Sequence, residues 1–372
     1  MKQATVQDVV RLMESFAPKS YAMEGDKIGL QIGSLNRNVK RVLAALDVLE
    51  HVVDEAVEKD AQMIVAHHPV IYRPLSAIDL DGRYGKMIEK LIKHDIAVYA
   101  AHTNLDVAPG GVNDMLCERL QLRDAEPLVP TKEIPLKKLV CFVPKGHLQP
   151  VIDALGKAGA GAIGNYSYCS FAAEGIGRFL PGENTNPFIG RPGKLEEVEE
   201  VRLETIFPET IEKQVIARML ESHPYEEPAY DIYPLENEGM KLGLGRIGIA
   251  HEEMGLDEYA EFVKKALRAK AVRVVGNPGH RVRKVAVLGG DGNKFFSHAK
   301  EKGADVYITG DVYYHTAHDA LMAGLNIIDP GHHMEHVMKE QTAEKLNRLF
   351  REAGLDAEAL PSEPPTDPFR FV

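Results

Sequence analysis

Short apolar runs separated by stretches of helical spacing dominate the first third of the chain. The run Met-Ile-Val-Ala at 63–66 is too short for a helix and is bounded by polar residues, which is typical of a buried strand. The segment 1–20 has the spacing of an amphipathic helix. The same reasoning predicts strands at 39–46, 63–66 and 96–101, and helices at 51–59 and 84–94. Buried strands that alternate with helices indicate βαβ units and a mainly parallel sheet over about 1–128.

The last part of the chain, about 241–372, repeats this pattern. We expect strands at 282–288, 305–309 and 325–328, and helices at 295–302, 315–323 and 334–353. The GGDG segment at 289–292 predicts a tight turn, and a phosphate cradle at the next helix is a weaker alternative. The Pro-rich tail from Pro361 is expected to be extended. The two ends of the chain therefore read as two similar α/β halves of one domain.

The middle segment, 129–240, has a different order of elements. Strands are expected at 136–143, 166–173, 198–206 and 230–234, with helices at 147–158 and 211–222. This β-α-β-β-α-β order is the ferredoxin-like plan. A Gly-, Pro- and Asn-rich loop at 181–193 is expected between the two central strands. We therefore predict a discontinuous α/β domain that is interrupted by an α+β insert able to fold by itself.

Charge and composition exclude several classes of protein. The net charge of −11 disfavours a general nucleic-acid surface, because no basic stripe offsets the acidic background. No apolar stretch approaches the length of a membrane span, and the N-terminal segment lacks the apolar core of a signal peptide. The three scattered cysteines, Cys117, Cys141 and Cys169, are expected to be buried thiols of a reduced compartment. We expect a cytoplasmic protein with no membrane partner.

Histidine and acidic side chains gather directly after three of the predicted strands. Because the carboxyl ends of parallel strands meet at one edge of a sheet, these side chains are expected to lie together. Each cluster alone has an ordinary structural explanation, but their coincidence at three strand ends favours a site for two metal ions. The candidate ligands are His67, His68, Asp106, His332 and Glu335.

The types of ligand narrow the choice of metal. Asp106 could bridge two cations with its two oxygens. If the final helix already begins at this cluster, His332 and Glu335 stand three residues apart on one of its faces. Imidazole mixed with carboxylate suits zinc, with manganese or iron as alternatives. His333 remains a substitute for His332. We therefore expect two divalent ions per chain.

His102, four residues before Asp106, is the first candidate for a catalytic proton-transfer group beside the ions. His315 and His318 on a predicted helix are second candidates. A solvent-facing helix surface or a role in orienting another ligand is the alternative for these two. Such a group must lie within hydrogen-bond reach of the reacting atom.

Five segments carry a resemblance to a known family. They are GDKIGLQIGS from Gly25, AHHPVIYRPL from Ala66, YAAHTNLDVAPGGVND from Tyr99, ADVYITGDVYYHTAHDA from Ala304 and LNIIDPGHHMEH from Leu325. Together they resemble the NIF-three-like dinuclear metal-centre family, whose members are also called GTP cyclohydrolase 1 type 2 homologues. The resemblance implies the same five metal ligands and suggests GTP as substrate, with ring opening and loss of formate. A tryptophan often found in the family is absent, which affects packing more than ligation.

The insert resembles CutA- and PII-like domains, on the segments HPYEEPAYDIYPL from His223 and GRPGKLEEVEEVRLE from Gly190. This resemblance implies that the insert forms trimer contacts and that the chain assembles into a homohexamer. Two functions follow as hypotheses. The first is a metal-dependent hydrolase of a nucleotide or related small molecule. The alternative is a non-catalytic metal-binding regulator or scaffold whose insert binds an effector or drives assembly.

Overall fold

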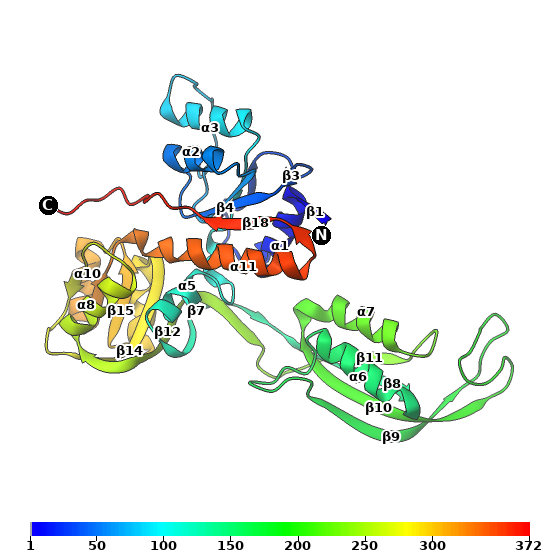
Figure 1. The fold of residues 1–372 in the computed structure, drawn as a ribbon. Helices are drawn as coiled ribbons and strands as arrows, with labels where there is room; N and C mark the ends of the chain where they lie inside the picture. Colours follow the sequence, from blue (N-terminus) through cyan, green and yellow to red (C-terminus); the bar gives the residue numbers. More distant parts are fainter. Residues whose placement is uncertain (1) are drawn as a thin grey trace. The chain divides into compact units, whose positions relative to one another are not determined.

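The computed structural model describes residues 2–372, which form two compact units (Figure 1). The first unit contains the chain up to Lys132 together with Leu242–Val372, and the second unit is Glu133–Lys241. None of the helices in the described part of the chain combines the length and apolar character needed to cross a bilayer.

The first unit contains a five-stranded sheet with strand order β18-β4-β5-β6-β2. Neighbouring strands are parallel except for β2, which runs antiparallel to β6. The strands are β18 (Glu358–Pro361), β4 (Arg41–Ala45), β5 (Met63–Ala66), β6 (Ala97–Ala100) and β2 (Gly29–Ile32). The prediction of a mainly parallel sheet is correct for this part of the chain.

Both faces of this sheet are covered, which explains why its strands are apolar throughout. Along β4, Leu43 packs in the core formed with α2 (Glu50–Glu58) and α3 (Arg83–Lys93). The next residue, Ala44, belongs to the core that contains α1 and α11 residues. Successive side chains of a β-strand point to opposite faces of the sheet, which explains why Leu43 and Ala44 lie in different cores. The covering helices on the second side are α1 (Val6–Phe16) and α11 (Met338–Glu352).

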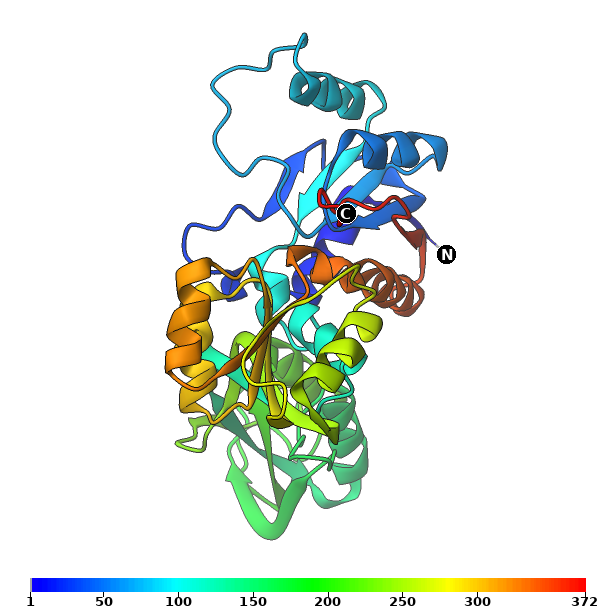
Figure 2. The ribbon, with the colours of Figure 1, turned by 90° about the vertical axis from the view of Figure 1, so that its left-hand side faces the viewer.

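A second, six-stranded sheet of the first unit is mixed rather than mainly parallel. Its order is β13-β16-β15-β14-β12-β7, and only β16, β15 and β14 are mutually parallel. The strands are β13 (Arg273–Val275), β16 (Asn326–Asp329), β15 (Val306–Gly310), β14 (Arg281–Asp291), β12 (Met240–Gly255) and β7 (Arg123–Ile134). Figure 2 shows α10 (Tyr314–Met322) on one side of this sheet and α8 (Leu256–Ala266) on the other.

The two ends of the chain complete each other's sheets. β18, close to the C-terminus, pairs in parallel with β4, and β7 from the N-terminal segment is an edge strand of the second sheet. β1 (Lys2–Thr5) pairs with both β17 (Leu355–Asp356) and β3 (Asn38–Val39). Neither half of the sequence therefore contains all the strands of its own sheet.

The second unit is a four-stranded antiparallel sheet with two helices on one face. Its strand order is β11-β8-β10-β9. The elements are β8 (Leu136–Pro144), α6 (Leu148–Lys157), β9 (Ser170–Phe179), β10 (Glu196–Pro208), α7 (Glu212–Ser222) and β11 (Tyr230–Pro234). Leu203 and Phe207 of β10 pack against Val151 of α6 and Met219 of α7 in a separate core. β9 begins four residues later than its predicted start at 166.

Several local predictions differ from the structure. The expected N-terminal helix starts only at Val6, because Thr5 caps it and exchanges hydrogen bonds with Asp8. The predicted turn at 289–292 is wrong, since β14 continues to Asp291. The remaining short helices are α4 (Thr103–Val107), α5 (Val112–Arg119) and α9 (Phe296–Glu301), and a 3₁₀ segment, η5 (His332–Val337), precedes α11.

Candidate metal centre

Three strand ends of the first unit bring the predicted ligands together. His67 and His68 directly follow β5, Asp106 lies on α4 just after β6, and His332 begins η5 shortly after β16. Glu335 lies one 3₁₀ turn after His332, and side chains three residues apart eclipse each other in a 3₁₀ helix. The sequence prediction that these side chains share one location therefore agrees with the geometry.

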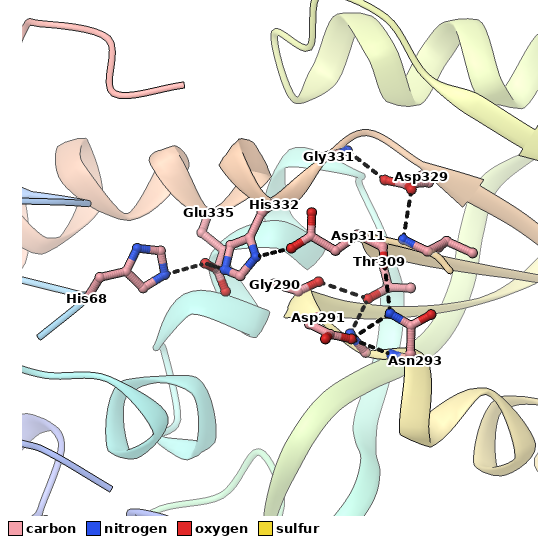
Figure 3. A network of polar contacts seen from close by, with 12 residues as sticks. His68, Gly290, Asp291, Asn293, Thr309, Asp311, Asp329, Gly331, His332 and Glu335 are labelled. Carbon is pink, nitrogen blue, oxygen red and sulfur yellow. Dashed lines mark hydrogen bonds and ion pairs between the residues drawn. The ribbon is translucent and has the colours of Figure 1, made fainter. Parts of the chain in front are cut away.

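Glu335 is the centre of the cluster. Its Oε2 lies 3.1 Å from His68 Nε2 and 3.3 Å from His332 Nε2, and its Oε1 lies 3.6 Å from His67 Nε2. The Glu335 side chain is almost fully buried. Figure 3 shows His68 and His332 directed at this carboxylate from opposite sides. One carboxylate thus presents different oxygens to different imidazoles.

Two buried polar atoms in the cluster have no hydrogen-bond partner. They are His67 Nε2 and Asp106 Oδ1, which lie 3.7 Å from each other. His67 Nδ1 donates to the carbonyl oxygen of Ala101 at 2.9 Å, so the ring directs Nε2 and its lone pair into the site. Leaving such buried atoms unpaired is costly unless something else binds them.

The ligand atoms fall into groups of three, each group lying within 4.8 Å. One group is His67, Asp106 and Glu335, and another is His68, His332 and Glu335. The carboxylate common to both groups is Glu335, whereas the sequence interpretation gave the bridging role to Asp106. The difference arises because η5 places Glu335 next to both remaining pairs of side chains, His67 with Asp106 and His68 with His332. The positions of the strand ends do not predict this placement.

Carboxylates fix the orientation of two of the rings. His68 Nδ1 donates to Asp47 Oδ1 at 2.7 Å, and His332 Nδ1 donates to Asp311 Oδ2 at 2.7 Å. Each bond leaves the Nε2 atom pointing at Glu335, an arrangement typical of histidines that ligate metals. Sequence reasoning missed Asp47. The sequence nevertheless contains a signal for it, because Asp47 is the second residue after β4, just as His68 is the second residue after β5.

His102 lies beside the cluster and has its own carboxylate partner. Its Nδ1 is 2.9 Å from Asp26 Oδ1, and its ring centroid is 5.3 Å from that of His67. His67, His68 and His102 form a third group of possible ligand atoms. Asp26 was missed as a partner because it lies 76 positions before His102 in the sequence, although it belongs to the GDKIGLQIGS segment.

The other candidate histidines lie outside these groups. The His333 ring stacks on His336 at 5.1 Å, and burial with the nearby His336 lowers the pKa of His333 to about 4. His315 and His318 are exposed on α10, with their rings against Tyr314. The structure therefore brings His332 rather than His333 to the centre, and it does not bring the two α10 histidines there.

Protonated imidazoles balance the carboxylates when no metal is bound. Burial lowers the pKa of His68, but hydrogen bonds to Asp47 and Glu335 outweigh it and raise the pKa to about 10. The contact with Glu335 is the main cause that raises the pKa of His332 to about 9. Burial raises the pKa of Asp106 to about 6. The cluster therefore requires added positive charge, which protons or cations can supply.

The glycines at the end of β14 have a steric role beside the centre. A Cβ on Gly289 would lie 2.8 Å from Glu335 Oε1, and one on Gly290 would lie 3.1 Å from His332 Nε2. Gly290 also has a φ of +66°, which favours glycine. The GGDG segment therefore makes room for the ligands, and this explains it better than the phosphate cradle considered from the sequence.

A cavity of about 700 Å³ adjoins the cluster, and His68 and His332 are among its lining residues. Arg268, Lys270 and Lys339 also line it. Lys270 pairs with Asp367 at 3.0 Å, whereas the half-buried Lys339 forms no ion pair within residues 2–372. Lys339 can therefore offer positive charge to a ligand that reaches the cluster, although the lining also contains the carboxylates of Asp47, Asp311, Glu363 and Asp367.

Comparisons with known proteins identify the family. The model of Duf34/NIF3 (NGG1p interacting factor 3) matches residues 4–368. The chain belongs to the Duf34/NIF3 family. It is 58% identical over 372 residues to a Halalkalibacterium halodurans protein and 56% identical over 371 residues to a Bacillus subtilis protein, and each match covers all of both chains. Both relatives carry the name GTP cyclohydrolase 1 type 2 homolog.

Solved structures agree with this assignment. A crystal structure of a Bacillus cereus protein related to NIF3 superposes with a TM-score of 0.90 at 56% identity, covering 100% of both chains. A Staphylococcus aureus protein superposes with a TM-score of 0.72 at 32% identity, again over 100% of both chains. The mixed α/β fold is therefore that of the NIF3 family, and it carries a side-chain cluster that could hold metal ions.

Proposed function

We propose that this member of the NIF3 family holds two divalent metal ions and uses them to hydrolyse a small anionic substrate. The observation that carries the proposal is the pair of buried, unpartnered atoms, His67 Nε2 and Asp106 Oδ1, facing a carboxylate shared by two ligand groups. Imidazole and carboxylate donors together suit zinc, manganese and iron. Zinc is our first choice for the ion.

Two divalent ions, when bound, polarise the bond under attack and lower the pKa of water. The protein would hold them with His67, His68, Asp106, His332 and Glu335. His102 is placed to move a proton, because Asp26 accepts from its Nδ1 and leaves Nε2 free on the side of the cluster. Asp26 would also stabilise the ring after it gains a proton.

The cavity beside the cluster supports a substrate with negative charge. Lys339 has no carboxylate partner in the described chain, whereas Arg268 and Lys270, which also line the cavity, pair with Glu340 and Asp367. Lysine and arginine are common phosphate ligands. The names of the relatives suggest GTP, for which opening of the five-membered ring would release formate.

Metal content and turnover of GTP, measured on one preparation, test this proposal. We expect about two metal ions per chain and release of formate that stops when a chelator removes the metals. If metals bind but GTP and phosphoesters are untouched, hydrolysis of these substrates is wrong and the regulatory alternative leads.

Replacement of His102 separates proton transfer from metal binding. We expect His102→Gln to keep the metals and to lower kcat by about 10²–10⁴-fold, the usual contribution of a general acid–base group. The assay is steady-state turnover with metal analysis of the same sample. His315→Gln, on the exposed α10, is the matched control and should change neither. Loss of metal from the His102 variant would instead show that His102 is itself a metal ligand. Its position close to the ligand atoms of His67 and His68 is compatible with that role.

The alternative function is regulation or assembly, and the second unit favours it. Its β-α-β-β-α-β order with strand order β11-β8-β10-β9 fits a ferredoxin-like domain of the CutA/PII kind. Its edge strand β9 exposes Phe171 (67%) and Ile176 (60%), which favours contact with further copies of the chain. We propose a homohexamer in which the inserts form trimer contacts. The unpaired thiols of the chain are compatible with the cytoplasm.

Removal of the insert tests its role in assembly. In the first unit, Thr131 Oγ1 lies 3.5 Å from the carbonyl oxygen of Leu242, so a short Gly-Ser turn can replace residues 133–241. We expect the shortened chain to keep its metals and to form a smaller oligomer than the full chain. Light scattering after size-exclusion chromatography measures the mass, and metal analysis is the control for folding. An unchanged oligomer would show that the insert does not drive assembly.

A further inference from the structure

The second unit contains a cavity of about 720 Å³ that is separate from the candidate metal centre. It lies along β9 and β10 and under the loop that connects them, a loop visible in Figure 1 beyond the ends of these strands. The segment 225–229, between α7 and β11, forms another wall. The aromatic side chains in its lining are Phe142, Phe179, Phe188 and Tyr225.

A buried carboxylate lies in the wall of this cavity. Glu200 of β10 is 8% exposed, and its Oε1 accepts a hydrogen bond from Tyr225 Oη at 2.8 Å. A Cβ on Gly177 would lie 2.0 Å from Glu200 Oε2, so a glycine is required to seat the carboxylate in this position. Glu200 forms no ion pair with any residue in the described part of the chain. Burial of a carboxylate without a counter-charge is unfavourable.

The two arginines of the lining do not supply this counter-charge. Arg178 Nε pairs with Glu197 Oε1 at 2.6 Å, and Arg202 Nε pairs with Glu204 Oε1 at 2.8 Å. The other charged residues of the lining are carboxylates, namely Glu174, Glu226 and Glu227. The lining therefore has more negative than positive charge, which disfavours an anion.

Aromatic rings stand next to the carboxylate. The Tyr225 ring lies 5.8 Å from the Phe179 ring and 6.4 Å from the Phe188 ring, measured between centroids. Aromatic faces combined with a carboxylate recognise ammonium and guanidinium groups, which gain from both ion pairing and cation–π contact. We propose that this cavity binds a small organic cation whose charged group pairs with Glu200 and whose carbon body packs on these rings.

Such a site gives the insert a ligand of its own, and it does not depend on whether the metal centre is catalytic. It would make the second unit a sensor for amines or guanidines. The oxygen of Glu200 that Tyr225 does not contact is the expected partner of the cation. Tyr225 then has a positioning role, because it holds the carboxylate against Gly177.

Calorimetric titration of the full metal-loaded chain with choline, agmatine and putrescine tests the proposal. We expect at least one of them to bind with Kd below about 1 mM, and 3,3-dimethylbutan-1-ol, the neutral analogue of choline, not to bind. Glu200→Gln should weaken binding by about tenfold or more, since it removes the charge and keeps the shape. The matched control is Glu199→Gln, the neighbouring exposed carboxylate, which should bind like the unmodified chain.

Two results would overturn the proposal: no binding of any cation by the full chain, or equal binding by the Glu200→Gln variant. Circular dichroism checks that this variant folds. If it does not fold, Tyr225→Phe keeps the ring and removes the hydrogen bond, and an unchanged Kd in that variant would contradict the positioning role. Metal content measured on the same samples reports the first unit separately, so failure of this site is distinguishable from failure of the hydrolase proposal.

Discussion

Asp106→Asn is expected to remove metal from the centre and to abolish any metal-dependent turnover. The asparagine keeps the size of the side chain but replaces a charged oxygen donor with a neutral amide. Changes to groups that only orient metal ligands typically lower metal affinity by about 10–100-fold, and loss of a direct ligand should exceed this range. The measurement is metal content by mass spectrometry after dialysis, together with turnover at saturating metal.

The expected loss of metal follows from the position of Asp106 in the structure. Its Oδ1 is buried without a partner, 3.7 Å from the equally unpartnered His67 Nε2. Asp81→Asn, on an exposed loop, is the control and should leave metal content unchanged. If Asp106→Asn retains the metal content of the unmodified chain, the group formed by His67, Asp106 and Glu335 is not a metal site. The group formed by His68, His332 and Glu335 would then be the remaining candidate.

The strands that carry the ligands were predictable because each is a short apolar run with a polar boundary. The predicted strand at 63–66 coincides with β5, and those at 96–101 and 325–328 differ from β6 and β16 by one residue at each end. Once the strand ends were placed, the rule that ligands gather at the carboxyl ends of parallel strands led directly to the histidines and carboxylates.

Pairing between distant strands was not predictable from local patterns. β18 pairs with β4 across more than three hundred residues, and no periodicity in either strand encodes its partner. The strand β12 was missed because its Gly-rich sequence has no clear alternation. As a result the second sheet was expected to be mainly parallel, whereas it is mixed. Tertiary context decides these features.

The same limit applies to the side chains around the ligands. Asp26 and Asp47 orient His102 and His68, yet each is remote in sequence from the histidine that it contacts. The central position of Glu335 depends on the 3₁₀ geometry of η5, where an ordinary helix was expected. Residue type and spacing thus identified the donors, but only the three-dimensional arrangement shows which carboxylate is shared.

Phe350→Ala is expected to destabilise the first unit by about 3–5 kcal/mol, the usual cost of removing a buried aromatic side chain. Phe350 of α11 is 1% exposed and lies in the core that combines residues of β4 and β5 with residues of β14 and β15. A cavity here would therefore weaken the packing of α11 against β4 and β18, its main neighbours among the strands. The measurement is the free energy of unfolding in guanidinium chloride, with the metal removed so that binding does not add to stability.

The exposed face of the same helix provides the control for this change. Glu344→Ala should alter the free energy of unfolding by no more than about 0.5 kcal/mol, because it removes no buried contact. A loss below about 1 kcal/mol in the Phe350 variant would show that this side chain is not tightly packed in the core between α11 and its strands. The expected large loss has a consequence for the metal centre. η5, which carries His332 and Glu335, runs directly into α11, so the helix that covers the first sheet also anchors two of the ligands.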